Sequence, residues 1–214
     1  MSSTNVQKST KGRTYSSSLR ARQAAETRSQ VLLTAIECFS EDGYAGTTLA
    51  AVAERAGVAV ETVYSRFRSK KRLLREAFNV AVAGDTEPIP FVDRPEFASF
   101  ATGTREERLR RAIKVSTDIL IRTIGLWTAL VEAASSDVEI AGWRTEFEQM
   151  RRTDVGRSLE VVTDTKLTPT TIDMATAMIG ADLYTSLTRD FGWSRRKYEQ
   201  EIVSLMTDLL ARST

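Results

Sequence analysis

The sequence contains no histidine, one cysteine and only four prolines among its 214 residues. Without histidine, Ser-His-Asp and Cys-His nucleophilic sites cannot form, and the commonest transition-metal ligand is missing. A single cysteine, Cys38, cannot close an intrachain disulfide, and its place beside Phe39 on an apolar helix face favours core packing over a redox role. Gly-rich phosphate loops are also missing, so we expect no cofactor, no metal and no enzymatic activity.

Long apolar runs are absent as well. No run approaches 18 apolar residues, and the N-terminal stretch MSSTNVQKSTKGR lacks the apolar core of a signal peptide. We therefore expect a cytoplasmic protein that does not enter a membrane. Long proline-free stretches favour an all-α fold, and 42% hydrophobic residues suffice for one large or two small domains.

Charge is distributed unevenly along the chain. Residues 1–83 contain 13 Lys and Arg against 7 Asp and Glu, whereas residues 84–214 contain 17 against 21. This asymmetry is what a phosphate-binding head on a partner-binding body would show, although a merely solvated basic surface gives the same count.

Two short helices are predicted on either side of Gly57, within residues 47–75. Glycine suits the left-handed conformation that ends a helix sharply. The apolar residues that repeat at helical spacing are Leu49, Val52 and Ala53 before the glycine and Val60, Val63, Tyr64 and Phe67 after it. Two short helices joined by a tight turn form a helix-turn-helix, whose second helix enters the major groove of DNA. An ordinary corner in a helical bundle would give a similar pattern.

An amphipathic helix precedes this motif, and FRSKKRLLREAF, with Ser69 as a possible cap, follows it. Residues 28–78 carry AxxxFxxxGYxxTTLxxVAxxAGV and then TVYxxFxSKxxLL, and they resemble the DNA-binding domain of the tetracycline-repressor (TetR) family of transcriptional regulators. The resemblance implies a three-helix helix-turn-helix head, a helical body for ligand binding and dimerisation, and a pseudo-palindromic double-stranded DNA operator.

Candidate DNA-contacting residues follow from the motif. They are Thr48, Ala59, Val60, Glu61, Thr62, Tyr64, Ser65, Arg66 and Lys70. Arg66 can donate to guanine or phosphate, Val60 and Thr62 can touch thymine methyls, and Tyr64 can bond a phosphate. Thr48 is the expected N-cap of the second helix, while Lys70 matches the phosphate-contacting lysine of the family. Ala59 and Arg66 depart from the family pattern, which puts the operator sequence in doubt more than DNA binding.

We expect three regions: a disordered basic arm (1–20), the DNA-binding domain (21–83) and the ligand-binding and dimerisation domain (84–214). The arm either contacts DNA or only solubilises the chain. The expected helices include 21–42, 60–67, a short helix at 95–101, a stripe over 105–124, a separate helix 126–134, 137–162 and 169–191, with a last helix capped by Ser194.

The resemblance further implies a homodimer through the last two helices, within residues 183–210, and a body pocket for a small-molecule effector. Candidate pocket residues on inward stripes are Thr117, Leu120, Trp127, Trp143, Phe147, Met178 and Tyr184, each of which could equally be plain core. Few charges are expected to point inward, so the sequence favours an apolar or aromatic effector. The alternatives are a DNA-binding regulator controlled by a protein partner, without a pocket, and an enzyme that uses the body cavity.

Overall fold

The computed structural model describes residues 10–87, 89 and 91–212. Its helices are α1 (Thr10–Gly46), α2 (Leu49–Arg55), α3 (Val60–Phe67), α4 (Lys70–Ala83), α5 (Pro95–Ala98), α6 (Arg105–Ala134), α7 (Val138–Thr163), α8 (Pro169–Met178), α9 (Ala181–Thr185) and α10 (Arg195–Ala211). Two 3-10 turns, η1 (Phe91–Asp93) and η2 (Ser99–Ala101), and a π-helical turn, η3 (Ser186–Asp190), complete them. The described residues contain no strand, which confirms the predicted all-α fold. None of their helices is long and apolar enough to cross a membrane.

Side-chain caps fix where several helices begin. The Thr48 hydroxyl accepts the Ala51 amide at 3.0 Å, and the Ser69 hydroxyl accepts the Arg72 amide, as the sequence predicted. Each cap satisfies an amide that has no partner within its own helix. Because these caps are local, the start of α2 and of α4 could be read directly from the chain.

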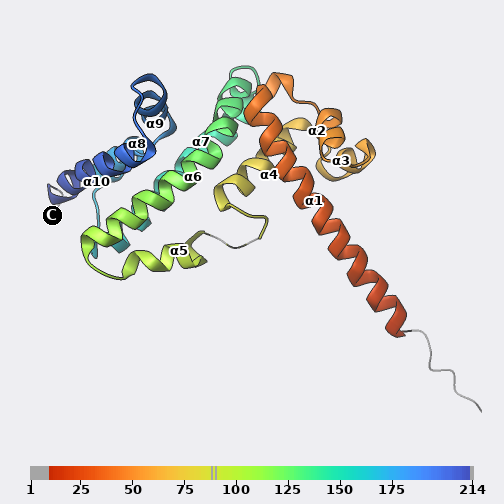
Figure 1. Ribbon diagram of the computed structural model, residues 1–214, viewed down its shortest axis with the longest axis horizontal. Helices are drawn as coiled ribbons and strands as arrows, with labels where there is room; N and C mark the ends of the chain where they lie inside the picture. The colour runs from red at the N-terminus through yellow and green to blue at the C-terminus, as the bar shows by residue number, and fades with distance from the viewer. Residues whose placement is uncertain (1–9, 88, 90, 213–214) are drawn as a thin grey trace, which may run out of the picture.

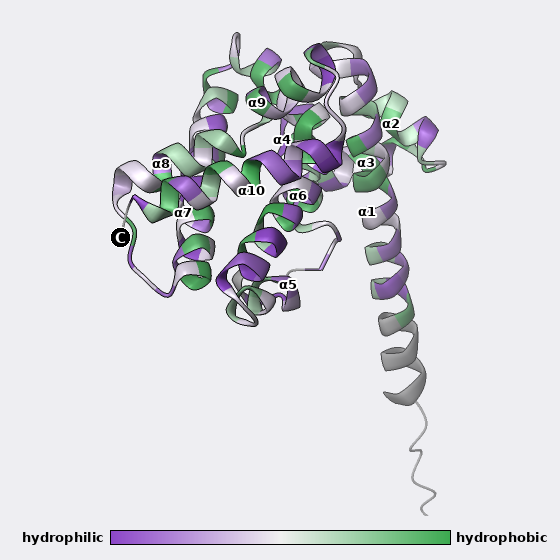
Figure 2. Ribbon diagram, turned by 60° about the vertical axis from the view of Figure 1, so that its left-hand side comes forward, coloured by the Kyte–Doolittle hydropathy of each residue, from purple (hydrophilic) through white to green (hydrophobic). Residues whose placement is uncertain are grey.

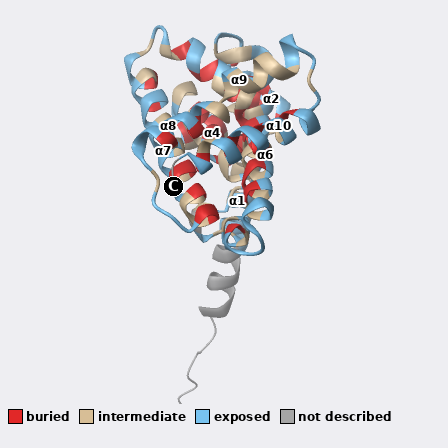
Figure 3. Ribbon diagram, turned by 90° about the vertical axis from the view of Figure 1, so that its left-hand side faces the viewer, coloured by how far each residue is buried: buried red, intermediate tan, exposed pale blue. Residues whose placement is uncertain are grey.

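The helices form a head and a body (Figure 1). The head contains α2, α3, α4 and the adjoining half of α1, and the body is built on the long neighbours α6 and α7. The short α8 and the last helix, α10, pack together at the end of the body far from α2 and α3. Buried segments lie on the inner sides of the helices, with exposed loops around them (Figure 3).

Two hydrophobic clusters hold the molecule together. The head cluster joins α1–α4 to the C-terminal half of α6 and the start of α7, through residues that include Leu126, Leu130, Ile140 and Trp143. Cys38 belongs to this cluster, and burial raises the pKa of its thiol, as expected of an inert core cysteine. The body cluster packs the N-terminal half of α6 against η2, α7, α8 and α10. The hydrophobic boundary therefore crosses α6 and does not lie in the proline-rich segment 84–103.

Two helices that the sequence separates are one. We expected a new helix near Gly125, but α6 runs unbroken from Arg105 to Ala134. A Cβ atom on Gly125 would lie 2.5 Å from the Cβ of Ser40 and 2.9 Å from its Cα. The glycine therefore allows α1 to cross closely over α6 and does not mark a helix start.

Residues 169–191 were expected to form one helix, but the structure divides them. The helix stops at Met178, and α9 begins only after Gly180. The Arg151 guanidinium donates to the Thr176 carbonyl oxygen at 2.8 Å, and the Gly180 amide bonds the Ala177 carbonyl oxygen. A cation from α7 thus binds the acceptor that the next helical turn would need, and glycine lowers the cost of leaving the helix.

The N-terminal arm also differs from its prediction. We expected disorder over 1–20 and a helix start near Ala21, but α1 begins at Thr10, while residues 1–9 lie outside the described residues. An existing helix adds residues more easily than a new helix nucleates, so a polar sequence can extend it without tertiary contacts. The part of α1 that extends away from α2 and α3 is largely hydrophilic where Figure 2 colours it by hydropathy.

Two large apolar residues that follow the apolar spacing of their helices are half exposed. Met150 on α7 exposes 50% of its surface and lines a cavity, while Leu205 on α10 exposes 49%. Both follow the correct helical period, but the period cannot tell a core from a cavity or from an outward apolar face.

Candidate nucleic-acid interface and a cavity in the body

Helix α3 divides its side chains between core and solvent. Val63 and Phe67 are fully buried in the head cluster, whereas Tyr64, one residue after Val63, is 53% exposed. Of the predicted contact residues, the exposed ones are Thr48, Ala59, Glu61, Tyr64 and Ser65, and the half-buried ones are Val60, Thr62, Arg66 and Lys70. None of the nine is buried, so all of the residues expected at the groove are accessible at the surface of the head.

The turn between α2 and α3 contacts α1. Gly57 has a φ of +66°, which favours glycine, and no atom lies within 4 Å of the position its Cβ would occupy. The Gln30 side chain on α1 donates to the Ala56 carbonyl oxygen at 2.7 Å. The turn of the helix-turn-helix is therefore connected to α1 by a hydrogen bond as well as by packing.

Lys70 has structural partners that the motif did not indicate. Its ammonium donates to the Tyr44 carbonyl oxygen at 2.7 Å and lies 4.2 Å from the centre of the Tyr44 ring. A lysine ammonium has three N–H donors, so two remain for other acceptors. Lys70 thus connects the start of α4 to the end of α1 and still presents positive charge beside α3.

Polar contacts from the body fix both ends of the head. The Glu132 carboxylate on α6 accepts the Tyr44 amide at 3.0 Å, and Arg122 donates to the Ala81 carbonyl oxygen at 3.0 Å. On α4, Arg75 pairs with Glu146 of α7 at 2.8 Å. These contacts hold α1 and α4, the helices on either side of α2 and α3, to α6 and α7.

A cavity of about 800 Å³ lies between the two hydrophobic clusters. Phe78 and Phe147 line it from the head cluster, and Phe100 and Val155 line it from the body cluster. The C-terminal half of α4 contributes Phe78, Asn79, Val82 and Ala83, so the same helix that follows α3 also forms a wall of the cavity.

Three of the seven predicted pocket residues line this cavity, namely Leu120, Trp127 and Phe147. The other four lie outside its lining. The Thr117 hydroxyl donates to the Ile113 carbonyl oxygen within α6, and Trp143 packs in the head cluster. Met178 and Tyr184 pack against the body cluster. Helical periodicity placed all seven inward, but it could not show which of them adjoin unfilled space.

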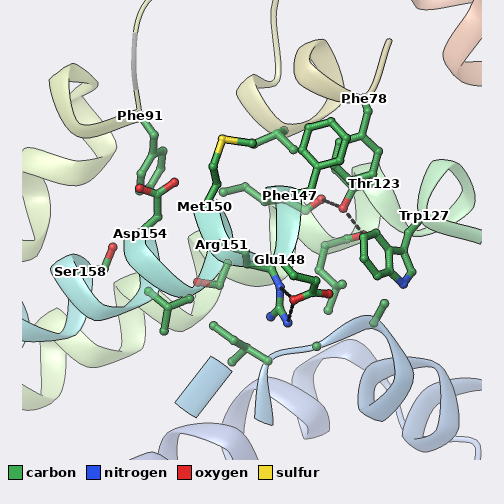
Figure 4. A pocket seen from close by; sticks show the side chains of 18 of the residues that line it. Phe78, Phe91, Thr123, Trp127, Phe147, Glu148, Met150, Arg151, Asp154 and Ser158 are labelled. Carbon is green, nitrogen blue, oxygen red and sulfur yellow. Dashed lines mark hydrogen bonds and ion pairs between the residues drawn. The ribbon is translucent and has the colours of Figure 1, made fainter. Parts of the chain in front are cut away.

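Charged side chains also line the cavity, contrary to expectation. Arg151 donates to Glu148 of its own helix at 2.8 Å, and Arg94 donates to Asp85 at 2.6 Å. The Asp85 carboxylate accepts that bond, which lowers its pKa to about 2. Helix α7 supplies four polar residues of the lining, Glu148, Arg151, Asp154 and Ser158, which recur at helical spacing along one face (Figure 4).

Asp154 is the residue that the sequence reading missed. It lies on α7 one turn after Met150, on the stripe that carries Phe147, so a carboxylate within an apolar stripe was the available signal. Its side chain has no hydrogen bond or ion pair with any residue that the structure describes. Desolvation by burial raises the pKa of this carboxyl, and the charge of Arg157 partly offsets the effect.

An exposed helix after a tight turn on a helical head, joined to a helical body with its own cavity, is the arrangement of a helix-turn-helix DNA-binding regulator. Residues 31–77 match the family described as "Bacterial regulatory proteins, tetR family". The matched residues extend from α1 to α4, so the head is similar to the DNA-binding segment of that family. Comparison with curated proteins gives no match.

Solved structures show the same fold. A TetR-family member from Streptomyces coelicolor A3 is 19% identical, with a TM-score of 0.59 over 86% of this chain and 98% of that one. A transcriptional regulator from Rhodococcus sp. Rha1 is 16% identical, with a TM-score of 0.62 over 86% and 96%. A TetR-like regulator from Rhodococcus sp. RHA1 is 18% identical, with a TM-score of 0.58 over 86% and 96%. At these identities the likeness establishes the fold alone.

Proposed function

We propose that the protein is a ligand-responsive transcriptional repressor that acts as a homodimer in the cytoplasm. The observation that carries the proposal is a cavity of about 800 Å³ whose wall includes α4, the next helix after the recognition helix. A regulator controlled only by a protein partner needs no such cavity, so this alternative is less well supported. The cavity side chains include no histidine or cysteine, and we propose no enzymatic reaction for them.

The outer face of α3 supplies the DNA contacts in this proposal. Arg66 donates to a guanine or a phosphate, Tyr64 bonds a phosphate, and the methyl group of Thr62 touches a thymine methyl. The exposure of Tyr64 and the burial of Val63 support this orientation. Thr48 caps α2, whose N-terminal amides can bind a phosphate.

A dimer would present two recognition helices to one operator. Half-sites lie about 34 Å apart in such complexes, and two-fold symmetry is the usual arrangement. The end of the body far from the head carries exposed apolar side chains, with Met174 of α8 at 52%, Phe191 at 69% and Leu205 of α10 at 49%. We place the dimer contact on this end, through the last helices of the chain.

Ligand binding would act on DNA through α4. A molecule that fills the cavity presses on Phe78 and Val82, in the C-terminal half of α4, whereas Lys70 at the other end lies beside α3 and Tyr44. A shift of α4 therefore moves α3 relative to its twin. Repression is relieved only if the ligand binds the shifted state more tightly than the DNA-binding state.

Selection of bound fragments from random DNA tests the proposed function. Wild-type protein should enrich an inverted repeat, Arg66→Ala should relax preference at one position, and Tyr64→Ala should weaken binding to all sequences and reduce its salt dependence. Arg110→Ala, which removes an exposed arginine near the start of α6, away from both α3 and the proposed dimer contact, is the matched control. Unchanged fragment pools and salt slopes in both α3 variants would refute the assignment of α3.

A further inference from the structure

The two ends of the cavity differ in chemistry (Figure 4). At one end, Phe78 packs against Phe147 with ring centroids 4.4 Å apart, and Trp127 lies 6.3 Å from Phe78. At the other end, Asp154 and Phe91 contribute to the lining. A ligand that spans the cavity therefore meets aromatic surface at one end and a carboxylate at the other.

The two arginines of the lining already have anionic partners. The Arg151 guanidinium donates to Glu148 and to the Thr176 carbonyl oxygen, both at 2.8 Å. Arg94 donates to both carboxylate oxygens of Asp85 and to the Ile89 carbonyl oxygen. Neither guanidinium offers uncompensated positive charge to a ligand.

Asp154 is the reverse case. Its carboxylate accepts no hydrogen bond from the described residues, and its charged neighbour Arg157 is exposed and lines a separate, shallow hollow with Glu160 and Asp164. The hydroxyl of Ser158, one turn further along α7, also lines the cavity. Of the other two carboxylates in the lining, Glu148 is paired with Arg151, and Asp182 is exposed, so water solvates it.

A ligand that enters the cavity removes water from Asp154. An apolar ligand gives nothing in exchange, and an anionic ligand adds repulsion, whereas a positively charged donor replaces the lost hydration. The geometry points to a cationic aromatic molecule as the effector, with its ammonium or amidinium group on Asp154 and its aromatic body among Phe78, Phe147 and Trp127. This inference rests on the proposed role of the cavity and narrows the apolar or aromatic effector that the sequence favoured.

The effect of ligand charge on affinity is tested with three probes that share one apolar body: naphthylhexylamine, naphthylhexanol and naphthylhexanoate. Calorimetry on the full chain should give the tightest binding for the amine, weaker binding for the alcohol and the weakest for the carboxylate. Ion-paired hydrogen bonds at a part-buried site correspond to a difference of at least about tenfold between amine and alcohol. Equal or tighter binding of the alcohol or the carboxylate, or no binding of the amine, would overturn the inference.

Two variants test which carboxylate is responsible. Asp154→Asn keeps the size of the side chain but removes its charge, so the amine should lose at least about tenfold in affinity while the alcohol is unaffected. Asp182→Asn makes the same change at the exposed carboxylate and should alter amine binding much less. Equal losses in both variants would contradict the assignment to Asp154, and thermal melting confirms that each variant is folded.

DNA release is measured separately, on the fragment selected by the wild-type protein. The amine should displace that fragment, and Asp154→Asn should require about tenfold more amine, in proportion to its affinity. If the amine binds through Asp154 but leaves DNA affinity unchanged, the cation site stands and the ligand-released repressor is wrong. If the alcohol releases DNA better than the amine, the repressor stands and the cationic effector is wrong.

Discussion

The head cluster and the body cluster differ in how much of the chain they draw on. The head cluster combines the whole helix-turn-helix with the second half of α6 and the first third of α7, whereas the body cluster is confined to residues from Phe100 onward. The recognition helix is thus built into one unit with half of the body. The cavity lies where this unit meets the other cluster, so a ligand there contacts both.

The boundary between the two clusters does not coincide with the predicted boundary between the domains at residues 83 and 84. The segment 84–103, with three prolines, marks the end of α4, but α6 crosses from one cluster to the other without a break. A movement between the clusters must therefore bend or tilt α6 and α7 and cannot be a hinge in a linker. Such a tilt would change the shape of the cavity, because α4, α6 and α7 all line it.

The largest expected effect comes from Leu130, a body residue that belongs to the head cluster. Leu130→Ala should lower the free energy of unfolding by about 2–5 kcal/mol, because it leaves a cavity in a fully buried site. Hydrogen exchange should then increase in α1 and α4, although the substitution is in α6. Met206→Ala, in the body cluster, is the control, and its increased exchange should stay in α8 and α10. Increases in the same helices for both variants would show that the clusters are not separate.

A smaller effect is expected at the crossing of α1 and α6. Gly125→Ala places a methyl group against Ser40, whose backbone cannot move without shifting α1, and should destabilise the protein by about 1–3 kcal/mol. Gly142→Ala, on the exposed side of α7 with no atom within 4 Å, should instead stabilise it by about 0.5–1 kcal/mol. Chemical denaturation measures both. The same sign for both variants would mean that the close crossing does not constrain position 125.

The parts of the fold that the sequence predicts are those fixed by local chemistry. The bounds of α3, the caps Thr48 and Ser69 and the burial of Val63 and Phe67 follow from short-range spacing and agree with the structure. The errors arise where a residue far away in the sequence determines the local structure. Gly125 lies inside α6 because Ser40 of α1 packs closely against it. Helix α8 ends where Arg151, 25 residues earlier in the chain, donates to the Thr176 carbonyl oxygen.

The cavity was predictable only in part for the same reason. Leu120, Trp127 and Phe147 have the spacing of inward residues, but so have Trp143 and Tyr184, which pack in the clusters. Whether an inward side chain meets another side chain or empty space depends on how far the helices stand apart, which no single helix encodes. Phe91 reaches the cavity from a 3-10 turn, beyond what helical spacing indicates.

The smallest expected effect comes from Asp154, whose carboxylate pairs with none of the residues that the structure describes. Burial raises the pKa of Asp154, so the folded state binds this proton more tightly than the unfolded chain does. Stability from this group is therefore present at acidic pH and is lost as the pH rises through the folded pKa. Asp154→Asn should raise the melting temperature at neutral pH, and its advantage should shrink as the pH falls and the wild-type carboxyl becomes protonated. Melting curves of the ligand-free protein over this range measure the difference, with Asp182→Asn as the exposed control.

A lower melting temperature for Asp154→Asn at neutral pH would mean that a partner already compensates the charge of the carboxylate. The physical argument for a cationic ligand in the cavity would then fail.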